Sequence, residues 1–158
     1  MRRPRPASLE RGERLLAWAE TDAGEVVGGS RDALHLPDGT RLPWEQVATA
    51  DWDVDEGRLH VVEAGTFGEA LIEHVLVLGE PDRLLSLLRE RVTASIVVQR
   101  HVSVRDRLGA RVIGRRAPGR AGPIAWFVDY DAGLDPTDPG VSSVVDAALA
   151  AARADVGE

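Results

Sequence analysis

The chain of 158 residues contains no cysteine and no lysine, and its aromatic residues are four Trp, two Phe and one Tyr. Without cysteine, the chain cannot form a disulfide, a thiolate nucleophile or a cysteine-ligated metal site. The scarcity of aromatic side chains predicts a core built mainly from Leu, Val, Ile and Ala, with a few Trp as large anchors. No apolar run approaches the roughly 20 residues that span a bilayer, so we expect no membrane insertion.

The first residues are basic, but no apolar stretch follows them, so they lack the pattern of a secretory signal. We therefore expect a cytoplasmic protein in which residues 1–12 form a disordered lead-in. The apolar share of 44% is normal for a globular chain, and 158 residues suffice for one domain with an extension.

The net charge of −7 is distributed unevenly, and all nineteen basic residues are Arg. Residues 1–88 hold nine Arg against seventeen acidic residues, a balance of −8. Residues 89–120 hold nine Arg against two acidic residues, a balance of +7, and the remainder returns to −6. The middle segment is therefore the part of the chain whose charge favours an anionic partner.

The first half of the chain alternates short apolar segments with Gly-containing turn signals, which is typical of antiparallel strands joined by tight turns. Within residues 47–53, strict alternation predicts that Val47, Thr49 and Asp51 share one face while Ala50 and Trp52 lie on the other. Seven strands are predicted in this half, at residues 13–21, 25–30, 33–36, 41–44, 47–53, 58–64 and 71–78.

A helix is predicted at residues 81–95. Pro81 suits the first helical turn, where a missing N–H costs nothing, and Asp82 places acid at the positive end of the helix dipole. The apolar side chains recur at helical spacing and form a stripe that covers the open side of a sheet. This stripe consists of Leu84, Leu85, Leu88 and Val92.

After the helix, the apolar period changes from helical to alternating. Strands are predicted at residues 96–104, 110–116 and 124–130, and a final helix starts at Pro139 with Thr137 or Asp138 as its N-cap. Residues 96–158 are thus expected to form a βββα extension. Because about 60 residues are near the lower limit for an independent core, we expect this extension to pack on residues 13–95.

Seven antiparallel strands followed by one amphipathic helix is an order that resembles the pleckstrin-homology-like fold. The runs RLPWEQV (41–47) and ADWD (50–53) are similar to bacterial members of this class. The runs RVTAS (91–95) and GLDPTDP (133–139) resemble an uncharacterised actinobacterial family. The resemblance implies an α+β fold: a seven-stranded antiparallel β-sandwich capped by a helix over residues 13–95, then three antiparallel strands and a C-terminal helix. It implies no activity, because this fold hosts lipid binders, peptide binders and scaffolds.

Lipid-binding members of that class place basic residues around the first hairpin. Here the corresponding residues 20–25 carry only acidic charges, so an inositol phosphate would be repelled. We therefore do not expect phosphoinositide as a ligand.

Two clusters of charged residues are candidate sites. An Arg-rich segment, named here the Arg island, could present a surface to an anion, to nucleic acid or to an acidic protein. It lacks the stacking aromatics of single-strand platforms, which favours an intramolecular or solvated role. Its members are Arg100, Arg105, Arg107, Arg111, Arg115, Arg116 and Arg120.

The second cluster offers carboxylates to a divalent cation, but its residues also suit turns and caps. Its members are Asp129, Asp131, Asp135 and Asp138.

No motif of a known catalytic or phosphate-binding loop occurs in the chain. The four histidines fall on different predicted strands, where half-exposed surface positions are expected, although His60 and His74 would be neighbours if their strands pair. We therefore predict a non-catalytic interaction or scaffold module with a protein partner and no cofactor, and a homodimer through an exposed strand edge fits this interpretation. The alternatives are anion or nucleic-acid binding through the Arg island, and an enzyme whose carboxylate/histidine site assembles only in space.

Overall fold

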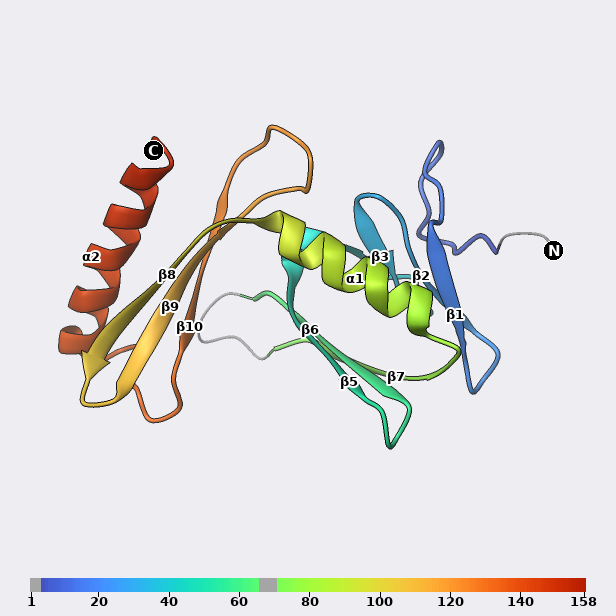
Figure 1. Cartoon of the computed structure of the whole chain (residues 1–158), viewed down its shortest axis with the longest axis horizontal. Coiled ribbons are helices and arrows are strands. Elements are labelled where there is room, and N and C mark those ends of the chain that lie inside the picture. Colours follow the sequence, from blue (N-terminus) through green and yellow to red (C-terminus); the bar gives the residue numbers. More distant parts are fainter. Residues whose placement is uncertain (1–3, 66–70) are drawn as a thin grey trace. The chain divides into compact units, whose positions relative to one another are not determined.

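The computed structural model describes residues 4–65 and 71–158, which fold as two compact units. The first unit comprises the residues up to Ser95 together with Ala117–Gly119, and the second comprises Ile96–Arg116 and Arg120–Glu158. The described residues form ten strands and two α-helices in the order shown in Figure 1. The α+β class is therefore confirmed, as are one seven-stranded and one three-stranded antiparallel sheet. No helix in the described ranges combines the length and the apolar character needed to cross a bilayer.

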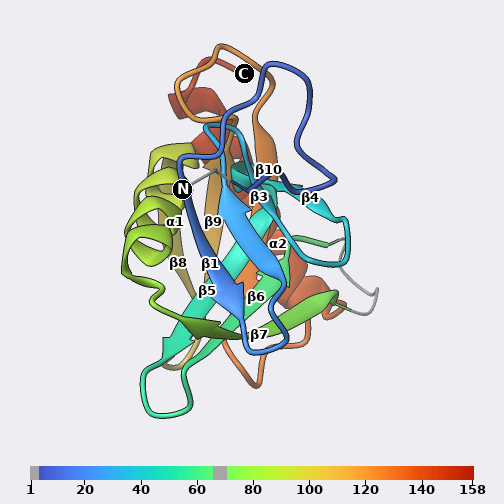
Figure 2. The same ribbon diagram turned by 90° about the vertical axis from the view of Figure 1, so that its right-hand side faces the viewer.

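The first unit is built on an antiparallel sheet with the strand order β4-β3-β2-β1-β7-β6-β5. Only two residue pairs join β1 to β7, Glu20 with Gly79 and Thr21 with Leu78, so the sheet curls where its two halves meet (Figure 2). A 3-10 turn at Trp44–Gln46 connects these halves along the chain. The strands are β1 (Ala17–Thr21), β2 (Val26–Gly29), β3 (Ala33–His35), β4 (Arg41–Pro43), β5 (Val47–Asp53), β6 (Arg58–Glu63) and β7 (Glu73–Gly79).

Helix α1 (Asp82–Ser95) supplies one wall of the core of this unit. The predicted stripe is confirmed: Leu84 and Leu88 are buried, and Leu85 and Val92 pack beside them. The largest fully buried side chain of this core is that of Trp44, whose Nε1 donates to the carbonyl of Ser30 at 3.0 Å. A Cβ at Gly29 would lie 2.6 Å from Leu87 Cδ2 and 3.0 Å from Trp44 Cζ2, so a larger residue would require both side chains to shift.

The side chains of β5 do not alternate between the two faces as predicted. The register between β5 and β6 shifts between Val47 and Thr49, which leaves Ala48 as the extra residue of a bulge. The bulge turns Val47 into the core, on the side of Ala50 and Trp52, whereas Thr49 stays exposed. The prediction that Val47 lies on the polar face was therefore wrong.

The second unit is a three-stranded sheet with the order β10-β9-β8, which packs against helix α2 (Pro139–Asp155). Its strands are β8 (Ile96–Arg105), β9 (Leu108–Arg115) and β10 (Ala125–Tyr130). Asp138 is the N-cap of α2, as predicted, because its side chain accepts from the N–H of Gly140 at 2.8 Å. The core of this unit consists of Ala110, Val112, Val141, Val145, Ala148 and Ala152.

The chain before β1, where we expected a disordered lead-in, is described from residue 4. Residues 4–12 contain two turns, closed by hydrogen bonds from Leu9 N to Pro6 O and from Glu13 N to Glu10 O. Ser8 contacts the buried His35 and Glu13 accepts from the buried Ser30, and the composition of the segment does not reveal these contacts.

Candidate functional site

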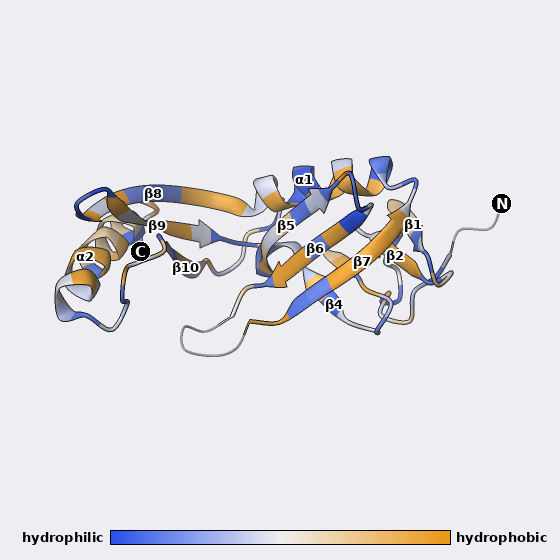
Figure 3. Ribbon diagram, turned by 90° about the horizontal axis from the view of Figure 1, so that it is seen from below, coloured by the Kyte–Doolittle hydropathy of each residue, from blue (hydrophilic) through white to orange (hydrophobic). Residues whose placement is uncertain are grey.

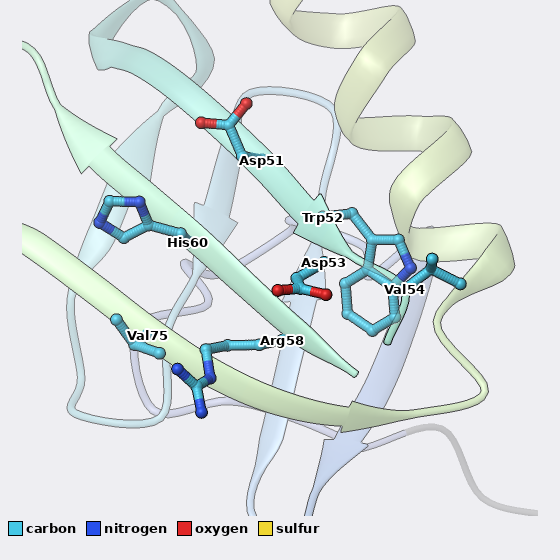
Figure 4. A pocket seen from close by; sticks show the side chains of 7 residues that line it. All are labelled: Asp51, Trp52, Asp53, Val54, Arg58, His60 and Val75. Atoms are coloured by element: carbon cyan, nitrogen blue, oxygen red, sulfur yellow. The ribbon is translucent and has the colours of Figure 1, made fainter. Parts of the chain in front are cut away.

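An open groove lies on the outer face of β5, β6 and β7, which is the face opposite to the core side chains Leu59, Val61 and Leu76 (Figure 4). Adjacent strands place side chains in rows across this face. One row joins Asp51, His60 and Val75, and the next joins Asp53, Arg58 and Val77. The groove is lined by Asp51, Trp52, Asp53, Val54, Arg58, His60 and Val75.

The two basic side chains of the groove, Arg58 and His60, already have acidic neighbours. Arg58 Nη2 lies 3.7 Å from Glu56 Oε2, and His60 Nε2 lies 3.6 Å from Glu73 Oε2. By contrast, Asp51 is exposed and has no hydrogen-bond or ion-pair partner within the described residues. The groove therefore presents unbalanced negative charge at β5.

Two apolar side chains of the groove are exposed, as are two residues just before β7. Val54 is 77% exposed in the turn after β5, and Val75 is 56% exposed on β7. Leu71 and Ile72, immediately before β7, are 60% and 57% exposed, and Figure 3 shows β7 as a largely hydrophobic strand. Clustered exposed apolar side chains with a polar rim mark interaction surfaces.

Strand β5 also forms one end of the seven-stranded sheet. Between residues 48 and 53 it pairs only with β6, and no other strand of the described ranges bonds its second edge. An unpaired edge offers backbone N–H and C=O groups to another extended chain. The acidic groove and this edge thus lie on the same strand.

A second polar cluster lies around His35, which is fully buried on β3, so the expectation of a half-exposed surface histidine was wrong here. Its Nδ1 lies 2.7 Å from Ser8 Oγ, and its Nε2 lies 3.0 Å from Ser30 Oγ. Ser30 donates to Glu13 Oε2 at 2.5 Å, and Arg41 Nη2 donates to the same oxygen at 3.1 Å. Since Ser30 gives its proton to Glu13, we assign Nε2 as the protonated nitrogen and Nδ1 as the acceptor from Ser8.

Burial lowers the pKa of His35 in this cluster, whereas hydrogen bonds lower the pKa of Glu13. The pKa of His35 lies below 6.5, and the negative charge of Glu13 opposes the shift only in part. Burial alone would raise the pKa of Glu13, but hydrogen bonds from Ser30, the Glu10 N–H and Arg41 outweigh it, so this pKa lies below 4.5. The cluster is a neutral imidazole beside an ionised carboxylate, which ties the N-terminal segment to the sheet.

The other histidines do not meet in one site. Strands β6 and β7 do pair, but His60 is opposite Val75 and His74 is opposite Val61, so the two imidazoles occupy opposite faces. His74 Nε2 lies 2.7 Å from Glu63 Oε2. Within the described ranges, no three His, Asp or Glu side chains are grouped closely enough to hold a metal ion.

The Arg island is split between the two faces of the second sheet. Arg100 pairs with Asp155 of α2, on the helix side. Arg111, which is opposite His101, points to the other face and pairs with Asp129 at 3.2 Å. The guanidinium groups therefore do not form one continuous surface.

The remaining members of the Arg island are equally scattered. Arg105 Nη2 lies 3.4 Å from Asp138 Oδ2, beside the start of α2, and Arg107 is exposed in the β8–β9 turn. Arg115 is buried at the end of β9, while Arg116 and Arg120 are exposed in the connection that follows.

The four aspartates proposed as a cation site each make a different contact within the second unit. Asp129 pairs with Arg111, and Asp131 accepts from the Gly109 N–H at 2.8 Å. Asp135 accepts from the backbone and the hydroxyl of Thr137, which hold its pKa below 3.8, and Asp138 caps α2. These contacts are those of turns and caps, so the geometry gives the metal hypothesis no support.

No family model, curated protein or solved structure matches this chain. The geometry of the outer groove, the edge of β5 and the His35 cluster is therefore the basis for a functional conclusion.

Proposed function

We propose that the first unit is a pleckstrin-homology-like interaction module that binds a partner protein by adding an extended segment of that partner to β5. The resemblance to this class supports the family part of the proposal, together with seven antiparallel strands followed by α1. The fold alone does not select a ligand, so the binding mode is argued from the surface.

The observation that carries the proposal is the unpaired edge of β5 between residues 48 and 53, directly beside the outer groove. In strand addition, backbone hydrogen bonds supply affinity, and alternate side chains enter pockets on the sheet face. Here the groove crosses from Asp51 on β5 to Val75 on β7, so it can receive side chains from an added strand.

The charge distribution favours a protein over an anionic ligand at this unit. The β1–β2 hairpin carries Glu20, Asp22 and Glu25, and the groove carries Asp51 and Asp53. A phosphoinositide head group or a nucleic acid would meet repulsion on both surfaces. The nucleic-acid alternative rests on the Arg island, where Arg100, Arg105 and Arg111 already pair with aspartates.

A peptide-display selection tests the proposal. A library of random 12-residue peptides is selected against the immobilised full chain, and amide hydrogen exchange of the chain is then measured by NMR with each selected peptide. We expect slower exchange at alternate residues between 48 and 53, because alternate backbone groups of an edge strand point outward. Amides of β4 at the other end of the sheet serve as the internal control and should be unchanged. If every selected peptide leaves the exchange of β5 unaltered, strand addition at this edge is wrong.

A further inference from the structure

We infer that the segment added to β5 is a cation–apolar–cation sequence, with Lys or Arg at two alternate positions. This inference rests on the proposed function and adds the chemical class of the partner. It follows from which β5 side chains an added strand would face.

Side chains of an added strand alternate between the two faces of the sheet, as those of β5 do. Asp51 and Asp53 lie on the outer face, and residues directly opposite them would have Cβ atoms about 4.5–5.5 Å away. At that distance a Lys or Arg side chain reaches a carboxylate without strain. Two positions of the partner, separated by one residue, therefore face acid.

Both carboxylates are available for such pairs. Asp51 has no partner within the described residues. Asp53 uses Oδ1 to accept from the N–H groups of Asp55 and Glu56, at 3.0 and 3.1 Å, which keeps its side chain in place. Arg58 lies opposite Asp53 on β6, and its Nη2 lies 3.7 Å from Glu56 Oε2.

The position between the two cations would face Trp52, whose side chain points to the other side of β5. Trp52 is half-buried against the core and also lines the groove, and Val54 beside it is 77% exposed. An apolar side chain there would cover indole and valine surface that water now contacts. The predicted recognition pattern is therefore cation, apolar residue, cation.

The same acids exclude other segments. An acidic side chain opposite Asp51 or Asp53 would place like charges in contact, which destabilises a strand pair. Selectivity therefore comes from repulsion of acidic segments as well as from attraction of basic ones. Because the pairs are exposed, binding should weaken as ionic strength rises.

Three synthetic peptides of equal length test the inference on the full chain. Each peptide alternates Val with one polar residue, which is Lys in the first peptide, Gln in the second and Glu in the third. Their affinities for the full chain are measured by fluorescence anisotropy at low and high salt. We expect the Lys peptide to bind about ten-fold more tightly than the Gln peptide at low salt, and the Glu peptide to bind most weakly. Asp51→Asn should weaken the Lys peptide about two- to five-fold and leave the Gln peptide unchanged.

The matched control is Glu25→Gln, which removes the same charge in the β1–β2 turn, away from β5. It should leave the affinity for the Lys peptide unchanged. Equal losses in Asp51→Asn and Glu25→Gln would show unspecific attraction and overturn the inference. If the Gln peptide binds as tightly as the Lys peptide and protects β5 amides, the charge preference is wrong while strand addition stands. If no peptide protects β5, strand addition itself fails.

Discussion

The two units of the chain bury side chains of very different size. In the first unit, Trp44, Leu34, Leu59 and Leu84 are all at most 1% exposed. In the second, the buried set is mostly Ala and Val, including Ala110, Val112 and Ala152. A buried Leu contributes about 1.5–3 kcal/mol to stability and the smaller Ala much less. The first unit buries larger side chains, so apolar burial contributes more to its stability than to that of the second unit.

The second unit surrounds its small core with polar contacts. Arg100–Asp155, Arg105–Asp138 and Arg111–Asp129 pair across its elements. Exposed ion pairs stabilise by only about 0–1 kcal/mol each, so they do not replace a large core. The comparison indicates that a unit of about 60 residues with such a core is near the limit of independent stability.

The largest effect is expected from Leu88→Asp, which places a carboxylate in the core of the first unit. Loss of the buried Leu alone costs about 2–5 kcal/mol, and an unpaired buried charge adds to it, against a total stability of about 5–15 kcal/mol. We expect the first unit to unfold, as measured by amide exchange of β6. Ser86→Asp, on the exposed side of the same helix, is the matched control and should stay folded.

The same variant tests whether the second unit depends on the first. Its marginal core predicts that the amides of β9 also lose protection in Leu88→Asp. Retained protection at Ala110 and Val112 would show that the second unit is stable alone, contrary to the expectation that it packs on residues 13–95.

Lowering the pH should have a smaller effect on folding stability, and it should destabilise the first unit before the second. The pKa of His35 lies below 6.5 in the folded state, so the unfolded chain binds a proton first as the pH falls. Stability is therefore complete above pH 6.5 and declines from there down to the folded pKa of His35. Glu13, whose folded pKa lies below 4.5, adds a second decline below pH 4.5 in the same direction.

Urea unfolding of the first unit between pH 7.5 and 5 measures the first of these declines. The lowered pKa of His35 already reflects the charged groups around the imidazole. Glu13 is its direct neighbour, and Arg41 and Glu10 act from beside Glu13. His35→Gln, which keeps polar contacts but does not titrate, should be less stable at pH 7.5 and nearly flat over this range. An unchanged pH slope in His35→Gln would contradict the assignment of the decline to His35.

Local patterns in the sequence predicted the elements, because each element is specified by residues near one another in the chain. The stripe of α1, the Asp138 cap and the succession of strands along the chain follow from period, cap chemistry and turn residues. The bulge at Ala48 was not predicted, because nothing in residues 47–53 marks which of them is left unpaired. The position of the bulge depends on how β5 is aligned with β6.

The candidate site required contacts between distant residues. Ser8, Glu13 and His35 are joined across 27 residues, and no spacing in the sequence announces that contact. The hairpin acids Asp51 and Asp53 were visible in the sequence, but only the end position of β5 in the sheet makes them a binding edge. Conversely, the Arg island was conspicuous in sequence, and the sheet divides its members between two faces.

The smallest effect is expected from two substitutions of Asp138, which distinguish its role as the N-cap of α2 from its ion pair with Arg105. Asp138→Ala should cost the second unit about 1 kcal/mol, because the Gly140 N–H loses its acceptor. Asp138→Asn keeps an N-cap of similar quality but removes the charge facing Arg105, 3.4 Å away, so it should cost less than about 0.5 kcal/mol. Both are measured by urea unfolding monitored at β9 amides. If Asn were as costly as Ala, the charge would matter more than the cap, and the second unit would owe more of its stability to ion pairs than its exposed geometry indicates.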